Sequence, residues 1–405
     1  MSGSSGNLGT LGGSLTYAYG LSPSGEVVGY SSTPGNSEGH AFYWSAGTMR
    51  DLGTLGGANS GAQAINASGT VVGWSDVAGT SGRHAFIWKD GAGMRDIGTL
   101  GGSTSYAQAI NESGQVVGTA FRAEPSPGGY AIYHAFLWSE ATGMRDLGTL
   151  GGEESEGEQI DAAGDVFGWS MTTGNERHAF VWTPGTGMRD LGTLGGTYSE
   201  IRAVSRSGQA TGTSSTANDA EYHAFVWTSG TGMRDLGTLG GSTSEGIAIN
   251  DAGQVVGYGP PAGSADEHAF LYTADGGMRD LGTLGGTRSW ANIITSTGQV
   301  IGSSTVAEDG ENHAFLWTPA DGMEDLFPAT GLSYPYKAND QLQIISDGTI
   351  ATFTSGTCSA SGATAHVSGA GTCGVTATQA GKAKHKPAAA GVAYEFVYAH
   401  RAPSQ

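Results

Sequence analysis

The chain alternates short apolar segments with turn-forming residues, and this arrangement recurs along most of its length. In one unit, Ala107–Asn111 is apolar, Gln115–Thr119 is rich in Val, and His134–Trp138 alternates aromatic and small side chains. A fourth segment, Met144–Leu147, completes the unit, and turns bearing Asn or Gly separate the segments. An alternation with a period of two predicts strands, and no long window shows the 3.6-residue period of a helix. Each unit is therefore predicted to contain four short strands.

Three phrases mark the repeat. GMRDLGTLGG begins at Gly143 and returns three times unchanged, and AINESGQVVG at Ala109–Gly118 has relatives in every unit. The third phrase, HAF followed by any residue and Trp or a close variant, begins at His40, His84, His134, His178, His223, His268 and His313. Four strands in each of seven repeats of about 45 residues are typical of β-propeller blades. A solenoid is the alternative, although solenoids usually have fewer strands per repeat. The sequence predicts an all-β fold with a seven-bladed β-propeller of four-stranded blades over residues 1–328.

An Arg-Asp pair recurs in six of the seven units. The pairs are Arg50-Asp51, Arg95-Asp96, Arg145-Asp146, Arg189-Asp190, Arg234-Asp235 and Arg279-Asp280, and Glu324-Asp325 takes their place in the seventh unit. A structural role is needed once per blade, whereas a catalytic residue rarely needs so many copies. We therefore predict that the Asp and the His of the HAF phrase form a hydrogen-bond or salt-bridge framework across strands or blades. A ring of His or Asp that binds a metal, and catalytic duty, remain as alternatives.

The charge of the chain limits its partners. The net charge is −19, and residues 331–405 contain five basic and three acidic residues, so the acidic excess belongs to the repeats. Such a surface repels the phosphates of nucleic acids and anionic lipids, but it is compatible with cations, neutral sugars or basic proteins. No apolar run approaches the roughly 20 residues that a membrane-spanning helix needs. We expect no nucleic-acid partner, no membrane insertion and a monomer.

Positions that differ between units are the candidates for function, because the constant positions build the scaffold. Near the start of the first strand one such series reads Tyr17, Gly61, Tyr106, Glu156, Glu200, Glu245 and Trp290. Two residues further on, a second series reads Tyr19, Gln63, Gln108, Glu158, Arg202, Ile247 and Asn292. The first strand of a blade is the innermost, so the side chains of the first series are predicted to lie near the mouth of the central channel.

Carboxylates on three consecutive blades would face aromatic side chains on the others. Aromatic rings stack on sugars, and carboxylates accept hydrogen bonds from hydroxyls or ligate Ca²⁺. The predicted ligand-binding residues are Tyr17, Tyr106, Glu156, Glu158, Glu200, Arg202, Glu245 and Trp290. Glu156, Glu200 and Glu245 are candidate catalytic residues for glycoside chemistry if their spacing suits it. A solvated acidic rim without a ligand remains the alternative. We expect no cofactor, and binding of Ca²⁺ stays open.

The three phrases resemble those of the HAF-repeat family of predicted extracellular bacterial proteins over residues 7–327. The resemblance implies a secreted or surface setting and says almost nothing about activity. The amino-terminal Asn7–Gly13, NLGTLGG, repeats the end of the closing phrase. We predict that it lies against the last blade and helps to close the ring.

The composition changes after Pro328. Thr352–Gly381 alternates small, polar and β-branched residues and, with GAGTCGVTATQAG at Gly369–Gly381, resembles bacterial Ig-like modules. This resemblance implies an Ig-like β-sandwich over residues 329–405 and a disulfide between Cys358 and Cys373. Such a bond implies an oxidising compartment, and two free thiols are the alternative.

The sequence thus predicts a secreted or surface binding protein that recognises a carbohydrate, a cation or a protein partner through one propeller face. The second candidate is a carbohydrate-active enzyme, a glycoside hydrolase or a polysaccharide lyase, that uses the carboxylates of the rim. HExxH and CxxC motifs are absent from the sequence.

Overall fold

The computed structural model describes residues 2–123, 129–307 and 310–326, and short strands between residues 335 and 366. One short 3₁₀ helix, Ala217–Asp219, is the only helical element in these residues, and every other regular element is a strand. The all-β prediction is confirmed. Among the described residues no helix has the length and apolar composition that crossing a membrane requires.

Seven units of four antiparallel strands follow one another, and within each unit every strand pairs with the next in the chain. Units one and two contain β2 (Thr16–Leu21), β3 (Val27–Ser32), β4 (Gly39–Ser45) and β5 (Thr48–Asp51), then β6 (Gly56–Ile65), β7 (Val71–Val77), β8 (Arg83–Lys89) and β9 (Gly93–Asp96). Units three and four contain β10 (Gly101–Ile110), β11 (Val116–Arg122), β12 (Tyr133–Ser139) and β13 (Gly143–Asp146), then β14 (Gly151–Ile160), β15 (Val166–Thr172), β16 (Arg177–Thr183) and β17 (Gly187–Asp190).

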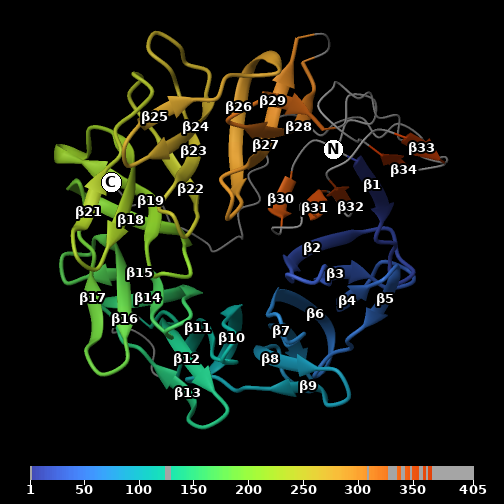
Figure 1. The fold of residues 1–405 in the computed structure, drawn as a ribbon. Helices are drawn as coiled ribbons and strands as arrows, with labels where there is room; N and C mark the ends of the chain where they lie inside the picture. Colours follow the sequence, from blue (N-terminus) through green and yellow to red (C-terminus); the bar gives the residue numbers. More distant parts are fainter. Residues whose placement is uncertain are drawn as a thin grey trace.

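Units five to seven continue the pattern. They contain β18 (Gly195–Val204), β19 (Ala210–Thr216), β20 (Tyr222–Thr228), β21 (Gly232–Asp235), β22 (Glu245–Ile249), β23 (Val255–Gly259), β24 (His268–Thr273), β25 (Gly277–Asp280), β26 (Gly285–Ile294), β27 (Val300–Val306), β28 (Asn312–Thr318) and β29 (Gly322–Asp325). The units are arranged around a centre, with the first strands toward it and the fourth strands at the periphery (Figure 1). Units four and five join into one eight-stranded sheet through a single parallel pair, Arg177 with Tyr198.

Neighbouring units pack large side chains against small ones. Phe136 and Trp138 of the third unit share a buried cluster with Val72 and Ala85 of the second unit. The alternation of the HAF phrase produces this arrangement, because successive side chains of a strand point to opposite faces of the sheet. Corresponding clusters lie between the other consecutive units.

A buried serine adds a hydrogen bond at each junction between consecutive units. The backbone N–H of the HAF alanine donates to a serine Oγ on the first strand of the next unit, or directly before it, at 2.8–2.9 Å. The pairs are Ala41–Ser60, Ala85–Ser105, Ala135–Ser155, Ala179–Ser199, Ala224–Ser244 and Ala269–Ser289. These six bonds link units one to seven in order.

A further sheet lies between the seventh unit and the first. It contains β30 (Pro335–Ala338), β31 (Gln343–Ser346), β32 (Thr349–Thr354), β1 (Ser2–Asn7), β34 (Thr364–His366) and β33 (Ser359–Ser361), in that order. β30 contacts both β26 and β2, and Asn292 Nδ2 donates to the Pro335 carbonyl at 2.9 Å. The amino-terminal strand and the strands that follow the seventh unit meet in this sheet, because β1 pairs antiparallel with β32 along its whole length (Figure 1).

This closure differs from the predicted one. Asn7–Gly13 was expected to lie against the last repeat, but Asn7 pairs with Thr349, and Leu8 packs on Ala18, Val27 and Phe42 of the first unit. The reason is that another sheet occupies the space between the seventh unit and the first. The described strands after residue 328 share a sheet with β1, and the domain boundary expected at residue 328 stays a prediction. Residues 367–405, and both Cys358 and Cys373, lie outside the described residues, and with them the predicted disulfide and most of the predicted sandwich.

Candidate functional site

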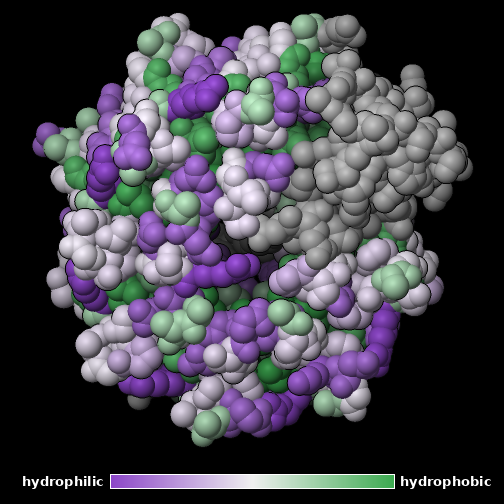
Figure 2. Space-filling model, in the orientation of Figure 1, coloured by the Kyte–Doolittle hydropathy of each residue, from purple (hydrophilic) through white to green (hydrophobic). Residues whose placement is uncertain are grey.

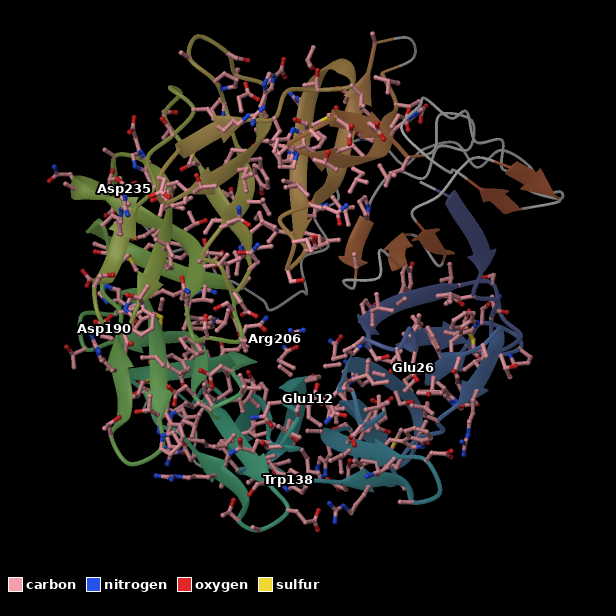
Figure 3. All side chains as sticks on the ribbon, in the orientation of Figure 1. Glu26, Glu112, Trp138, Asp190, Arg206 and Asp235 are labelled. Atoms are coloured by element: carbon pink, nitrogen blue, oxygen red, sulfur yellow. The ribbon has the colours of Figure 1, made fainter. Side chains whose placement is uncertain are left out.

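The repeated His and Asp form one pair in each of the seven units. In the third unit His134 Nδ1 lies 2.8 Å from Asp146 Oδ1, which also accepts a hydrogen bond from the Gly148 N–H at 2.8 Å. The other pairs are His40–Asp51, His84–Asp96, His178–Asp190, His223–Asp235, His268–Asp280 and His313–Asp325. Each pair ties the fourth strand to the third, and Asp190 and Asp235 lie at the periphery of the ring (Figure 3). The predicted framework is therefore confirmed as pairing across strands.

The repeated Arg connects one unit with the next. The Arg145 guanidinium lies 5.0 Å from the ring centroid of Trp182, which belongs to the following unit. The same stacking joins Arg50 with Trp88, Arg95 with Trp138, Arg189 with Trp227, Arg234 with Tyr272 and Arg279 with Trp317. Both members of the Arg-Asp pair thus have structural partners. In the part of the chain that the structure describes, no group of three or more His, Cys, Asp or Glu is placed to hold a metal ion.

Both variable series lie on the first strands of the units. The second series occupies a β-bulge in every unit, as Glu158 does between Gly157 and Gln159. A bulge re-aims the side chain of its extra residue, and bulges are frequent next to functional sites. The face of the molecule in Figure 2 carries hydrophilic side chains around the centre of the ring.

Units four and five bring together five charged side chains, which we call the channel cluster: Glu156, Glu158, Arg177, Glu200 and Arg202. The side chain of Glu200 is 9% exposed, and its carboxylate pairs with Arg177 Nη2 at 3.1 Å and with Arg202 Nη2 at 2.6 Å. The Tyr198 hydroxyl donates a further hydrogen bond to Glu200. Glu200 is thus held by donors from two units, because Arg177 comes from β16 and Glu200 from β18.

Glu156 is buried beside this ion pair. Its Oε2 accepts a hydrogen bond from Trp169 Nε1 at 3.2 Å, and the Arg177 guanidinium lies 4.2 Å from the centroid of the same indole ring. Burial raises the pKa of Glu156, whereas the charge of Arg177 and the hydrogen bonds to the carboxylate oppose that rise. Arg177 therefore stabilises carboxylates on both sides of the junction.

Glu158 is the most strongly perturbed carboxyl of the cluster. Loss of solvation raises its pKa to about 8, the negative charges of Glu156 and Glu200 add to the rise, and Arg177 and Arg202 oppose it. A pKa of about 8 favours the protonated carboxyl at neutral pH, and a protonated carboxyl can donate as well as accept hydrogen bonds.

Replacement of Glu158 by Gln is expected to stabilise the protein more at pH 8 than at pH 5. The folded-state pKa lies above the ordinary value of 4.5, so the contribution of Glu158 to stability falls as pH rises from about 4.5 to about 8. Gln cannot ionise and removes this loss. Urea unfolding at pH 5, 6.5 and 8 measures the difference. Exposed Glu153 on the same strand gives the control variant, Glu153→Gln, and equal pH trends for the two variants would contradict the placement of Glu158.

The other predicted site residues lie outside the channel cluster. Burial acts to lower the pKa of Arg202, but the negative charges of Glu200 and Glu245 raise it. Glu245 therefore lies at the edge of the channel cluster. Glu245 itself accepts a hydrogen bond from the Tyr258 hydroxyl at 2.9 Å. The aromatic residues of the series belong to other units: Tyr17 stacks on Tyr30, Trp290 Nε1 donates to Glu267 at 2.5 Å, and Tyr106 pairs with Thr119 across β10 and β11.

Two of the three carboxylates expected at the rim therefore belong to a buried network of charged side chains. Glu156 and Glu200 are buried and have partners, and two guanidinium groups offset much of the negative charge. Sequence reasoning missed Arg177 and its partner Trp169. A signal for Arg177 existed, because the residue before the HAF phrase also varies between units: Gly39, Arg83, Tyr133, Arg177, Tyr222, Glu267 and Asn312.

These features define an all-β repeat protein of the β-propeller type, with a charged cluster on the central side of units four to six. No family model matches the chain, and no curated protein matches it. Similar solved structures include the β-propeller domain of the Trilobed protease from Pyrococcus furiosus, with 10% identity, coverage of 77% of this chain and 98% of that chain, and a TM-score of 0.44.

Two further similar structures are dipeptidyl peptidase 4 from Porphyromonas gingivalis and TolB from Acinetobacter baumannii. The first has 10% identity over 74% of this chain and a TM-score of 0.49, and this chain spans 50% of its length. The second has 11% identity, covers 70% of this chain and 79% of that chain, and has a TM-score of 0.35. At these identities and TM-scores, the likenesses carry no argument about activity.

Proposed function

We propose that this protein is a binding protein whose channel cluster recognises a neutral, hydroxyl-rich ligand, a glycan. One observation carries the proposal: the scaffold repeats seven times, but among the described residues the buried carboxylates belong to units four and five. Unit two folds with Gly61 and Gln63 at the same two positions. Burial of charge costs free energy, and unit two shows that the repeat folds without charged residues at these two positions. Ligand binding is therefore the better explanation for the charges in units four and five.

The chemistry of the channel cluster suits hydroxyl groups. Arg202, whose side chain is 49% exposed, offers guanidinium donors, and Glu158 both donates and accepts while it keeps its proton. A hydroxyl also donates and accepts, so a sugar can use both kinds of partner. Arg177 and Arg202 offset the carboxylates, which favours a neutral ligand over a simple cation. The HAF resemblance supports an extracellular or cell-surface setting for a monomer, and a protein partner is the other outcome of a binding screen.

A glycan array followed by calorimetry tests the proposal. Arg202→Ala is expected to lower the affinity for any glycan hit about tenfold or more, because a charge-assisted hydrogen bond contributes about 1.5–3 kcal/mol. Gln63→Ala changes the corresponding bulge position of the second unit and is expected to leave the affinity unchanged. An array without hits, or equal effects of the two variants, would refute binding at the channel cluster.

A carbohydrate-active hydrolase or lyase is the second candidate function, and the raised pKa of Glu158 is the observation that favours it. A carboxyl that keeps its proton at neutral pH can act as a general acid in glycoside cleavage. Release of reducing or unsaturated ends from a polysaccharide panel, abolished by Glu158→Gln, would support this candidate. Binding without any product would support the binding protein.

A further inference from the structure

The arginines that stack on an aromatic ring at the junctions between units differ in whether an acidic side chain also pairs with them. At the first junction Arg50 Nη1 pairs with Asp90 at 2.5 Å, and at the second Arg95 Nη1 donates to Glu140 at 2.9 Å. Both acids lie two residues after the Trp on which the Arg stacks. Two junctions of this chain therefore show where an anion binds beside the Arg–Trp pair.

The fourth junction has the same Arg–Trp pair without the anion. Arg189 stacks on Trp227 at 5.8 Å, and the residue two positions after Trp227 is Ser229. Arg189 is exposed, and among the described residues its guanidinium has neither a hydrogen bond nor an ion pair. The position that Glu140 fills at the second junction is thus open at the fourth.

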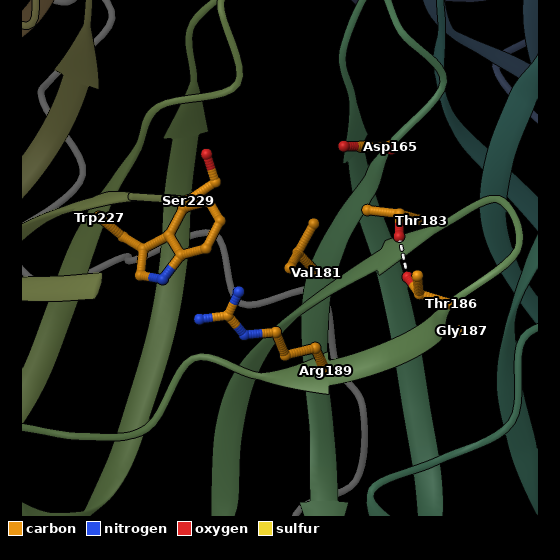
Figure 4. Close-up of a pocket in the computed structure, with 8 residues that line it drawn as sticks. All are labelled: Asp165, Val181, Thr183, Thr186, Gly187, Arg189, Trp227 and Ser229. Atoms are coloured by element: carbon orange, nitrogen blue, oxygen red, sulfur yellow. Dashed lines mark hydrogen bonds between the residues drawn. The ribbon is translucent and has the colours of Figure 1, made fainter. Parts of the chain in front are cut away.

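A groove of about 260 Å³ lies at this position. The fourth unit lines it with Asp165, Val181, Thr183 and Arg189, and the fifth with Trp227 and Ser229. Figure 4 shows the Arg189 guanidinium next to Trp227 and below Ser229, with Asp165 on the other side of Val181. The groove therefore offers a cationic donor at one end and a carboxylate acceptor at the other, with hydroxyls and an apolar wall between them.

We propose that this groove binds a uronate residue of an acidic polysaccharide. The sugar carboxylate takes the place of the Glu140 carboxylate and pairs with Arg189, as guanidinium and carboxylate groups do in their strongest hydrogen bonds. The hydroxyls of the sugar donate to Asp165 and exchange hydrogen bonds with Ser229. A sulfate ion lacks hydroxyls that could donate to Asp165, and a neutral sugar leaves Arg189 without an anion. This site is separate from the channel cluster and does not depend on it.

The net charge of −19 opposes a polyanion at long range. At about 0.15 M salt the Debye length is about 8 Å, so charges elsewhere on the ring are screened and the contacts within the groove decide binding. The test is therefore done at that salt concentration.

Calorimetry with polygalacturonate tests the proposal, and its fully methyl-esterified form is the control polymer without carboxylates. Ser229→Glu supplies the internal anion of the second junction and is expected to weaken binding at least tenfold, as is Arg189→Gln. Arg95→Gln, at a junction that already has its own acid, is expected to leave the affinity unchanged. All three positions are exposed, and melting curves verify that the variants fold.

Three results would overturn the proposal. They are no binding of polygalacturonate, equal binding of the methyl ester, and wild-type affinity in both Ser229→Glu and Arg189→Gln. A failure of Arg202→Ala to change neutral-glycan binding bears on the channel cluster alone, so the two sites are judged separately.

Discussion

Replacement of Gly73 by Ala is expected to destabilise the protein by about 3 kcal/mol or more. A Cβ at this position would lie 2.0 Å from the carbonyl oxygen of Gly61 and 2.9 Å from the Cα of Ala62. Both atoms belong to the backbone of the neighbouring strand β6, so no change of rotamer relieves the clash. The strands would have to separate next to the β-bulge at Gln63.

Gly230 gives the matched control. An added Cβ there would have no atom within 4 Å, and its φ is not in the left-handed region. Gly230→Ala is expected to change stability by no more than about 0.5 kcal/mol, because it alters an exposed turn. Urea unfolding of both variants measures the difference. If Gly73→Ala unfolds at the same urea concentration as Gly230→Ala, the pairing of β6 with β7 described above is wrong.

The close approach of the first strand also explains why the second strand of every unit has Gly at the position that corresponds to Gly73. In each unit the Cβ would lie 1.8–2.0 Å from the carbonyl oxygen of the first variable series. The glycines are Gly29, Gly73, Gly118, Gly168, Gly212, Gly257 and Gly302. This glycine permits the bulge, and the bulge holds Glu158 and Arg202 at their positions. A constant residue of the scaffold thus supports the residues that vary.

The strands and their order could be predicted from the sequence because every unit repeats the same local signals. The alternation of His134–Trp138, the turn at Asn111 and the glycines of the closing phrase each specify a local conformation. Seven copies of consistent signals leave few alternative folds. The closure of the ring could not be predicted in this way, because β1 and β32 pair across almost the whole chain and neither contains a repeat phrase.

The candidate site was predicted only in part for a related reason. Comparison of the units identified Glu156, Glu158, Glu200 and Arg202 as exceptions to the repeat, and the structure brings these four together. Their partners could not be deduced from positions on the first strand alone. Arg177 reaches Glu200 from the third strand of the preceding unit, so the pair depends on how two units pack.

Replacement of Arg177 by Ala is expected to cost about 3 kcal/mol, because removal of one partner leaves buried carboxylates without their counter-charge. Its side chain is 24% exposed and that of Glu200 only 9%, so solvent replaces little of the lost interaction. Arg177 also opposes the rise in the pKa of Glu156, so the variant raises that pKa further above its unfolded value. The loss of stability is therefore expected to be larger at pH 8 than at pH 5.

Arg83 is the matched control, because it also precedes the HAF phrase and stacks on a Trp, with its guanidinium 4.4 Å from the Trp74 centroid. Its partner Asp76 lies 3.0 Å away, but the Arg83 side chain is 42% exposed. An exposed pair contributes at most about 1 kcal/mol, so Arg83→Ala is expected to be the milder variant at every pH. Urea unfolding at pH 5 and pH 8 compares the two. Equal losses of stability in the two variants would mean that Arg177 acts only through its stacking on Trp169. The charges of the channel cluster would then be neighbours whose ion pairing does not stabilise the fold.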